Sequence, residues 1–150
     1  LLYPVDGEIS HEPVELGKAK VAREGQDVTI ISYSHAVLTA LQAAELLLIE
    51  GINATVVDLR TLNPMDRETV FAQVRKTGRA VLVQDPNGIG GINAQVCAAI
   101  CQDKETFRAL KCPVLQFSGR NTPVPFSKEL ERETIPQADK IAAEISKLFK

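Results

Sequence analysis

The chain has 150 residues, of which 45% are hydrophobic and 24% are charged, and its 17 basic residues nearly balance its 19 acidic ones. The net charge of -2 leaves no electrostatic footprint for nucleic acid or for an anionic membrane surface, so neither is expected as a partner. The apolar runs are also far shorter than the ~20 residues of a membrane helix. We therefore expect one soluble globular domain with a core of its own.

The start of the chain and its cysteines bear on its origin. The opening residues 1–10 do not have the basic and then apolar pattern of a secretory signal, and the initial Leu1 leads us to expect a fragment of a longer protein. Three cysteines, at positions 97, 101 and 112, are too few for a disulfide framework in a domain of this size. A reducing compartment is therefore expected.

The first predicted elements are two strands and a helix. Residues 18–23 alternate weakly between polar and apolar, which is typical of an edge strand, whereas residues 28–33 are rich in β-branched residues and predict a central strand buried on both faces. Strong helix formers occupy residues 35–50. Within them, Thr39, Gln42 and Glu45 predict one narrow polar stripe on an otherwise apolar helix.

The alternation of strand and helix then continues to the end of the chain. An N-cap at Asp66 and a closing Gly78 bound the second predicted helix. The other predicted elements are strands at residues 54–58, 79–84 and 114–117 and helices at residues 91–101 and 138–149, with a proline-containing loop before the last helix. This order predicts a three-layer α/β/α fold around a mostly parallel sheet.

A ligand site in such a fold is expected beyond the carboxyl ends of the strands, where neighbouring connections leave toward opposite faces. Three segments qualify, at residues 32–35, 58–61 and 85–91. Two of them supply the candidate crevice residues, which are Ser34, His35, Asp85, Asn87, Gly88, Gly90 and Gly91.

The glycine-rich segment at residues 85–91 has two interpretations. Free backbone N–H groups at a helix start favour anions, so the segment could hold a phosphate. However, a dinucleotide fingerprint that begins at Gly88 needs a glycine where Asn93 stands, and the Gly-Lys-Ser/Thr of a P-loop is absent. A tight strand-to-helix turn with close backbone packing is favoured.

The other candidate sites also have a plain structural alternative. His35 with Ser32 or Ser34 fits a hydrolase, but no Gly-x-Ser-x-Gly elbow is present, and Ser34 could cap the helix that follows. Cys97 and Cys101 share a helical face that could present two thiolates to a metal, although core packing is favoured. The catalytic interpretation of Asp58, Arg60 and Asp66 competes with loop ion pairs and a helix cap, which are favoured.

Taken together, four segments resemble the C-terminal domain of the transketolase family. They are residues 25–33 (GQDVTIISY), 58–66 (DLRTLNPMD) and 76–79 (KTGR) and the pair Gly90-Gly91, with further agreement at residues 1–3, 13–19, 112–114 and 123–125. Within that family they are most similar to beta subunits of thiamine-dependent 2-oxoacid dehydrogenases, of the pyruvate or branched-chain type. The alternative within the same superfamily is a transketolase or a deoxyxylulose-phosphate synthase.

This resemblance implies a five-stranded, mostly parallel sheet with one antiparallel edge strand, preceded by a lead-in at residues 1–17 and spanning residues 18–150. It also implies that the chain supplies subunit interface and acyltransferase docking, while the catalytic residues, thiamine diphosphate and magnesium lie elsewhere in the parent enzyme. The implied partners are an alpha subunit, a second beta subunit and the acyltransferase component. The implied compartment is a bacterial cytoplasm or the mitochondrial matrix.

Three departures from the family pattern accompany the resemblance. Ser34-His35 stands where glycine is common, and Gln84-Asp85 replaces an acidic pair. Asn93 and Gln95 interrupt a stretch that usually reads Gly-x-Gly-Ala-Glu. They affect the expected loop conformation more than the fold. A free-standing module that binds a small anion in the crevice is the alternative from a different class of protein.

Overall fold

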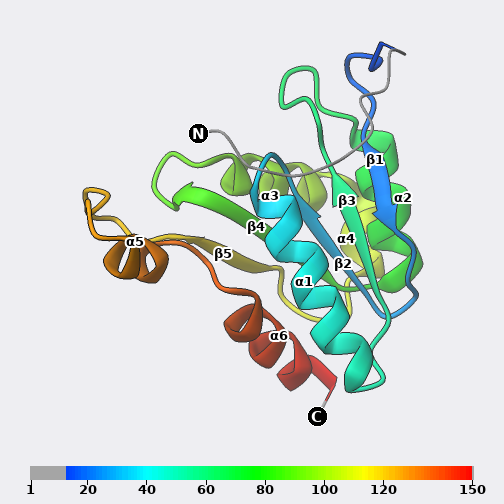
Figure 1. Cartoon of the computed structure of the whole chain (residues 1–150). Coiled ribbons are helices and arrows are strands. Elements are labelled where there is room, and N and C mark those ends of the chain that lie inside the picture. The colour runs from blue at the N-terminus through cyan, green and yellow to red at the C-terminus, as the bar shows by residue number, and fades with distance from the viewer. Residues whose placement is uncertain (1–12, 150) are drawn as a thin grey trace.

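The computed structural model describes residues 13–149 and contains one five-stranded sheet (Figure 1). The strand order is β1-β3-β2-β4-β5, with β1 antiparallel to β3 and every other neighbouring pair parallel. The strands are β1 (Lys20–Arg23), β2 (Val28–Ser32), β3 (Ala54–Asp58), β4 (Ala80–Asn87) and β5 (Leu115–Gly119). The predicted central strand and antiparallel edge strand are both confirmed.

Helices cover both faces of this sheet. The longest, α1 (Ala36–Ile49), packs with α6 (Ala138–Ser146) on one face, as Figure 1 shows. On the opposite face lie α2 (Arg67–Thr77), α3 (Ile92–Gln102) and α4 (Lys104–Ala109). A short α5 (Lys128–Thr134) follows the edge strand β5, and the 3-10 helix η1 (Lys147–Phe149) follows α6. The predicted α/β/α layers are confirmed.

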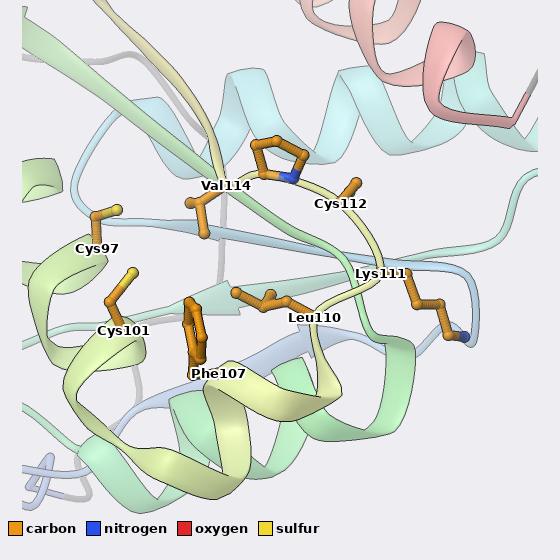
Figure 2. A pocket seen from close by; sticks show the side chains of 8 residues that line it. Cys97, Cys101, Phe107, Leu110, Lys111, Cys112 and Val114 are labelled. Carbon is orange, nitrogen blue, oxygen red and sulfur yellow. The ribbon is translucent and has the colours of Figure 1, made fainter.

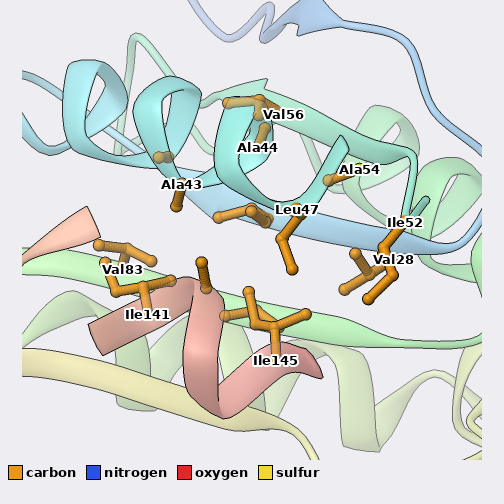
Figure 3. Close-up of a cluster of buried hydrophobic side chains, with 14 of the residues drawn as sticks. Val28, Ala43, Ala44, Leu47, Ile52, Ala54, Val56, Val83, Ile141 and Ile145 are labelled. Atoms are coloured by element: carbon orange, nitrogen blue, oxygen red, sulfur yellow. The ribbon is translucent and has the colours of Figure 1, made fainter. Parts of the chain in front are cut away.

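The period-two alternation of the strands divides the core between the two faces. Val28 and Ile30 of β2 pack toward α1 and α6, whereas Ile31 packs toward α2 and α3. Because both faces are covered, β2 is buried at every position, which explains why it reads as a continuous apolar run. Figure 3 shows α1 and α6 directing side chains that include Leu47, Ile141 and Ile145 into one cluster.

Asp66 joins the start of α2 to the chain that leads into β1. Its carboxylate accepts hydrogen bonds from the backbone N–H and the hydroxyl of Thr69, as a helix N-cap does. It also accepts a bond from the backbone N–H of Ala19, at 3.0 Å. Burial raises the pKa of Asp66, but these hydrogen bonds and the nearby Lys18 outweigh burial, so the net pKa lies below its ordinary value.

We expect Asp66→Ala to destabilise the chain by about 2 to 4 kcal/mol, from the lost cap and the unpaired Ala19 N–H. Because the pKa of Asp66 is lowered on folding, its carboxylate stabilises the fold above the unfolded pKa of ~3.9, and this contribution is lost as the pH falls through the folded pKa. Urea unfolding at pH 7 and at pH 3 measures both effects. The loss caused by Asp66→Ala should shrink at pH 3.

A matched control is Asp103→Ala, which removes the N-cap of the short helix α4. The side chain of Asp103 accepts hydrogen bonds within its own turn, from the N–H and hydroxyl of Thr106. Asp103→Ala should therefore lower the free energy of unfolding by less than Asp66→Ala does. Equal losses at the two positions would contradict the role given to the Ala19 bond.

Three local predictions need correction. Thr39, expected on a polar stripe, is buried because α1 packs against both the sheet and α6. The polar residues of α1 alone therefore did not identify the outer face of this helix. The strand predicted at residues 79–84 runs on to Asn87, where it pairs with Gly119 of β5. The helices α4 and α5 were not predicted, since both are short and largely polar.

The predicted division into a lead-in at residues 1–17 and a domain at residues 18–150 falls partly outside the described residues, and stays a prediction. Residues 13–17 contain no helix or strand, and the motif at residues 1–3 lies outside the described part. Within residues 13–149, no helix has the length and apolar character needed to cross a membrane.

Candidate functional site

The candidate crevice lies between β2 and β4, which are neighbours in the sheet. After β2 the chain leaves toward the face covered by α1, whereas after β4 it leaves toward the face covered by α3. The connections thus diverge at this point, which is where an open α/β sheet exposes the ends of its strands. Residues 34–35 follow β2, and residues 85–91 comprise the last three residues of β4 and the turn after it.

Two of the predicted crevice residues are in contact. His35 Nδ1 lies 3.1 Å from Asp85 Oδ2, although the residues are 50 positions apart in the chain. The two side chains are 26% and 27% exposed, so this contact is partly open to solvent. Tyr33 is close by, where burial and then the Asp85 carboxylate raise its pKa.

A buried glutamine shapes the end of β4 and the turn into α3. Gln84 is fully buried, and its Nε2 donates to the carbonyl oxygens of Pro86 and Asn87 at 3.2 and 2.7 Å. Its Oε1 accepts from the N–H of Asn93 at 2.9 Å, in the first turn of α3. A Cβ atom placed on Gly91 would lie only 1.9 Å from Gln84 Nε2. Only glycine fits at position 91, because its close packing on Gln84 leaves no room for a Cβ atom.

This geometry favours the tight-turn interpretation of residues 85–91 over a phosphate site. The backbone at Gly91 is packed on Gln84, and the N–H of Asn93 is already satisfied by that side chain. The crevice also contains the Asp85 carboxylate, which repels an anion. Gly90, with a φ of +73° and open space around it, turns the chain toward α3.

Two other predicted crevice residues, Asn87 and Gly88, lie away from the His35–Asp85 contact. Asn87, together with Asp85, lines a neighbouring hollow of about 250 Å³ that includes Gly119 and Arg120. Gly88 lies beside Ser118 of β5. The crevice residues therefore do not all converge on one point.

The structure does not support a hydrolase site at His35 with Ser32 or Ser34. The hydroxyl of Ser32 donates to the carbonyl oxygen of Val83 at 2.9 Å, so its proton is engaged inside the sheet. The prediction that Ser34 caps α1 is wrong, since His35 occupies the N-cap position, without a side-chain cap bond. Ser34 has a φ of +55°, and it is its backbone carbonyl that accepts from Val37.

The carboxylates after β3 have structural partners. Asp58 accepts a hydrogen bond from the N–H of Arg60 at 3.0 Å, which closes a local turn, and Asp66 caps α2. The helix cap that the sequence favoured is confirmed at Asp66, whereas Asp58 closes a backbone turn in place of the loop ion pair that was favoured. Among residues 13–149, no group of three or more histidine, cysteine, aspartate or glutamate side chains could hold a metal ion.

A separate pocket of about 540 Å³ lies between α3, α4 and the start of β5 (Figure 2). All three cysteines line it, together with Phe107, Leu110, Lys111, Pro113 and Val114. Burial and then the neighbouring Cys101 thiol raise the pKa of Cys97. The sequence placed Cys97 and Cys101 on one helical face but provided no signal that Cys112 lines the same pocket.

Two structural residues were missed from the sequence. Gln84 and Asn93 were noted only as departures from a family pattern, yet both are buried and tie β4 to α3 and β5. A polar residue at the end of an otherwise apolar strand was the available signal, because a buried amide needs partners.

Comparison with known proteins identifies the class. The family described as "Transketolase, C-terminal domain" matches residues 17–141, and the chain belongs to that family. A solved structure described as "Split gene transketolase, inactive beta4 tetramer" superposes with a TM-score of 0.78 at 30% identity, covering 95% of this chain and 45% of that one.

Curated relatives include beta subunits of pyruvate dehydrogenase. The chain is 43% identical to the pyruvate dehydrogenase E1 component subunit beta-2, mitochondrial, of Oryza sativa, over 93% of this chain and 37% of that protein. It is 41% identical to the corresponding beta subunit of Rickettsia bellii, over 91% of this chain and 42% of that protein.

A third relative has a different named activity. The beta subunit of an acetoin:2,6-dichlorophenolindophenol oxidoreductase of Cupriavidus necator is 40% identical, over 99% of this chain and 44% of that protein. The chain thus spans less than half the length of these relatives.

Proposed function

We propose that this chain is the C-terminal assembly domain of the beta subunit of a thiamine diphosphate-dependent 2-oxoacid dehydrogenase. Such an enzyme would decarboxylate pyruvate or a branched-chain 2-oxoacid oxidatively and pass the acyl group to a lipoyl group. The identity to pyruvate dehydrogenase beta subunits, over nine-tenths of the chain, supports this assignment. The cellular site would be a bacterial cytoplasm or the mitochondrial matrix.

In this proposal the catalytic centre belongs to other parts of the parent enzyme. Thiamine diphosphate and magnesium would be held there, and this domain would hold the subunits in place. The sequence lacks the Gly-Asp-Gly and downstream Asn that commonly hold the metal and diphosphate in this family. The His35–Asp85 pair would then be a contact that joins the start of α1 to the end of β4.

The observation that carries the assembly role is an apolar strip on the outer face of α1. Leu38, Leu46 and Ile49 are 40%, 39% and 83% exposed, and their spacing of eight and three residues places them on one side of the helix. We call these three residues the α1 strip. Leu46 and Ile49 also line a groove of about 580 Å³ that reaches Arg132 and the start of α6, and the polar Gln42 and Glu45 lie beside them in that groove. Exposed apolar side chains bordered by polar ones are typical of an interface.

The proposed occupant of the α1 strip is another beta subunit of the same enzyme. The relative described as an inactive beta4 tetramer supports contacts between beta chains, without implying which residues make them. An alpha subunit is the other partner of the parent enzyme in this proposal. The acyltransferase would contact the segment after β5, where Val124 and Phe126 are exposed.

The test uses the beta subunit that carries this domain and the double substitution Leu46→Asp with Ile49→Asp. We expect association to weaken roughly tenfold or more, since charges would be buried at the contact, and sedimentation at several concentrations measures it. Unfolding of the free chain should change little, because both side chains face solvent there. Leu48→Asp, on a different side of α1, is the matched control. Unchanged association of the double variant would refute the α1 strip as the contact.

A transketolase is the second candidate function. The superposition on a split gene transketolase, at 30% identity over 95% of this chain, favours it. The identities of 40 to 43% to dehydrogenase and oxidoreductase beta subunits favour the first candidate more strongly.

A further inference from the structure

The cysteine pocket has a chemistry that the assembly role does not use. Cys97 and Cys101 lie four residues apart on α3, so their side chains leave the same face of the helix on successive turns. Figure 2 shows both side chains directed into the pocket, one above the other. All three cysteines of the chain are free thiols.

Apart from Lys111, whose Nζ donates to the carbonyl oxygen of Thr77, the rest of the pocket is apolar. Phe107 of α4 lies beside Cys101, with Leu110 next to it, and Val114 lies on the opposite side of the pocket, near Cys97 (Figure 2). Cys101 is exposed and Cys97 is half-buried, so a molecule that enters the pocket reaches both sulfur atoms. Cys112 lies across the pocket from this pair.

We propose that Cys97 and Cys101 form a dithiol site for trivalent arsenic that carries an aromatic substituent. Sulfur is a soft ligand and prefers soft centres, and trivalent arsenic binds two neighbouring thiols as a chelate. The aromatic ring would pack on Phe107 and Leu110, which supply the apolar wall. A hard cation such as magnesium prefers oxygen ligands, which the two thiols do not provide.

The reaction is an exchange of ligands on arsenic. In phenylarsonous acid the arsenic carries the phenyl ring and two hydroxyl groups. Two S–H bonds and two As–O bonds break, two As–S bonds form, and each thiol proton leaves with one hydroxyl group as water. Arsenic stays trivalent and sulfur keeps its oxidation state, so no oxidant or reductant takes part.

The protonated state of the thiols suits this exchange. Burial and the neighbouring Cys101 raise the pKa of Cys97, which keeps its thiol protonated at neutral pH. Reagents that attack single thiolates should therefore react slowly with Cys97, whereas an arsenical gains from holding both sulfurs at once. Joining two binding events in one molecule raises the overall affinity by roughly a hundredfold or more.

The experiment is titration of the chain with phenylarsine oxide, followed by intact mass spectrometry under native conditions. We expect one phenylarsenic group per chain, retained in excess monothiol and removed by 2,3-dimercaptopropanol. Cys97→Ser and Cys101→Ser should each weaken binding by about a hundredfold. Cys112→Ser is the matched control and should bind as the unaltered chain does, because it lines the pocket without belonging to the pair.

Two further measurements keep the outcome decisive. Circular dichroism of each variant shows whether it is folded. Phe107→Ala tests the apolar wall, since this substitution should weaken the binding of phenylarsine oxide while leaving the binding of inorganic arsenite unchanged. Binding that keeps its full strength in Cys101→Ser, or that is lost with Cys112→Ser in a folded chain, would overturn the proposal. So would a native chain that takes up no arsenical.

Discussion

Replacing Gly91 with alanine should destabilise the chain by about 3 kcal/mol, because the new methyl group would occupy the position of Gln84. The Cβ atom would lie 1.9 Å from Gln84 Nε2 and 2.8 Å from the carbonyl oxygen of Asn87. Gln84 cannot swing away freely, since it is fully buried and bonded to the backbone of Pro86, Asn87 and Asn93. Displacing it would leave buried polar groups without partners.

Urea denaturation measures this loss, and Gly88→Ala provides the control within the same turn. A Cβ atom on Gly88 would make only ordinary contacts, 3.5 Å from Ser118, so its effect should stay within roughly 0.5 kcal/mol. If Gly91→Ala proved as mild as Gly88→Ala, the Gln84 packing would not be the reason for the glycine.

Leu47→Ala is expected to cost about 2 to 5 kcal/mol, the range for a leucine removed from a packed core. Leu47 has no exposed surface and lies in the cluster between α1, α6 and the sheet (Figure 3). The α6 residues Ile141 and Ile145 belong to the same cluster, so a cavity here should also loosen the contact between the two helices.

The control for this core substitution is the next residue on the same helix. Leu48 is 51% exposed, and Leu48→Ala should change the unfolding free energy by less than about 1 kcal/mol. The midpoint of the urea transition should shift for Leu47→Ala with little change in its slope. Similar losses at both positions would contradict the division of α1 into a core face and an outer face.

The strands and long helices follow from local patterns. β3 was predicted with its observed bounds because residues 54–58 are a short apolar run of a doubly covered strand. The ends of α2 followed from the side chain of Asp66 and the left-handed Gly78. These signals lie within a few residues of the feature that they determine, so the sequence is sufficient to find them.

Features that depend on neighbours distant in the chain were predicted poorly. Thr39 was assigned to a polar surface, yet packing of α1 against the sheet and α6 buries it. The short helix α4 gives little local signal, because a helix of 6 residues is stable only where the rest of the protein supports it.

In the candidate crevice, too, the sequence predicted the local features but not the contact between distant residues. The sequence indicated that residues 34–35 and 85–91 would follow strands, but two residues 50 positions apart can touch only after the strand order is set. That order places β2 beside β4, while the chain segment between them forms β3 on the other side of β2.

By itself, then, the sequence determined the alternation of strands and helices, the two caps of α2 and the family resemblance, since each depends on residues that are near in the chain. Only the tertiary structure decided the His35–Asp85 contact, the packing of Gln84 on Gly91 and the shared pocket of the three cysteines. These arise where sheet order and helix packing join distant segments, because burial of apolar surface on both faces of the sheet selects one arrangement of the whole chain.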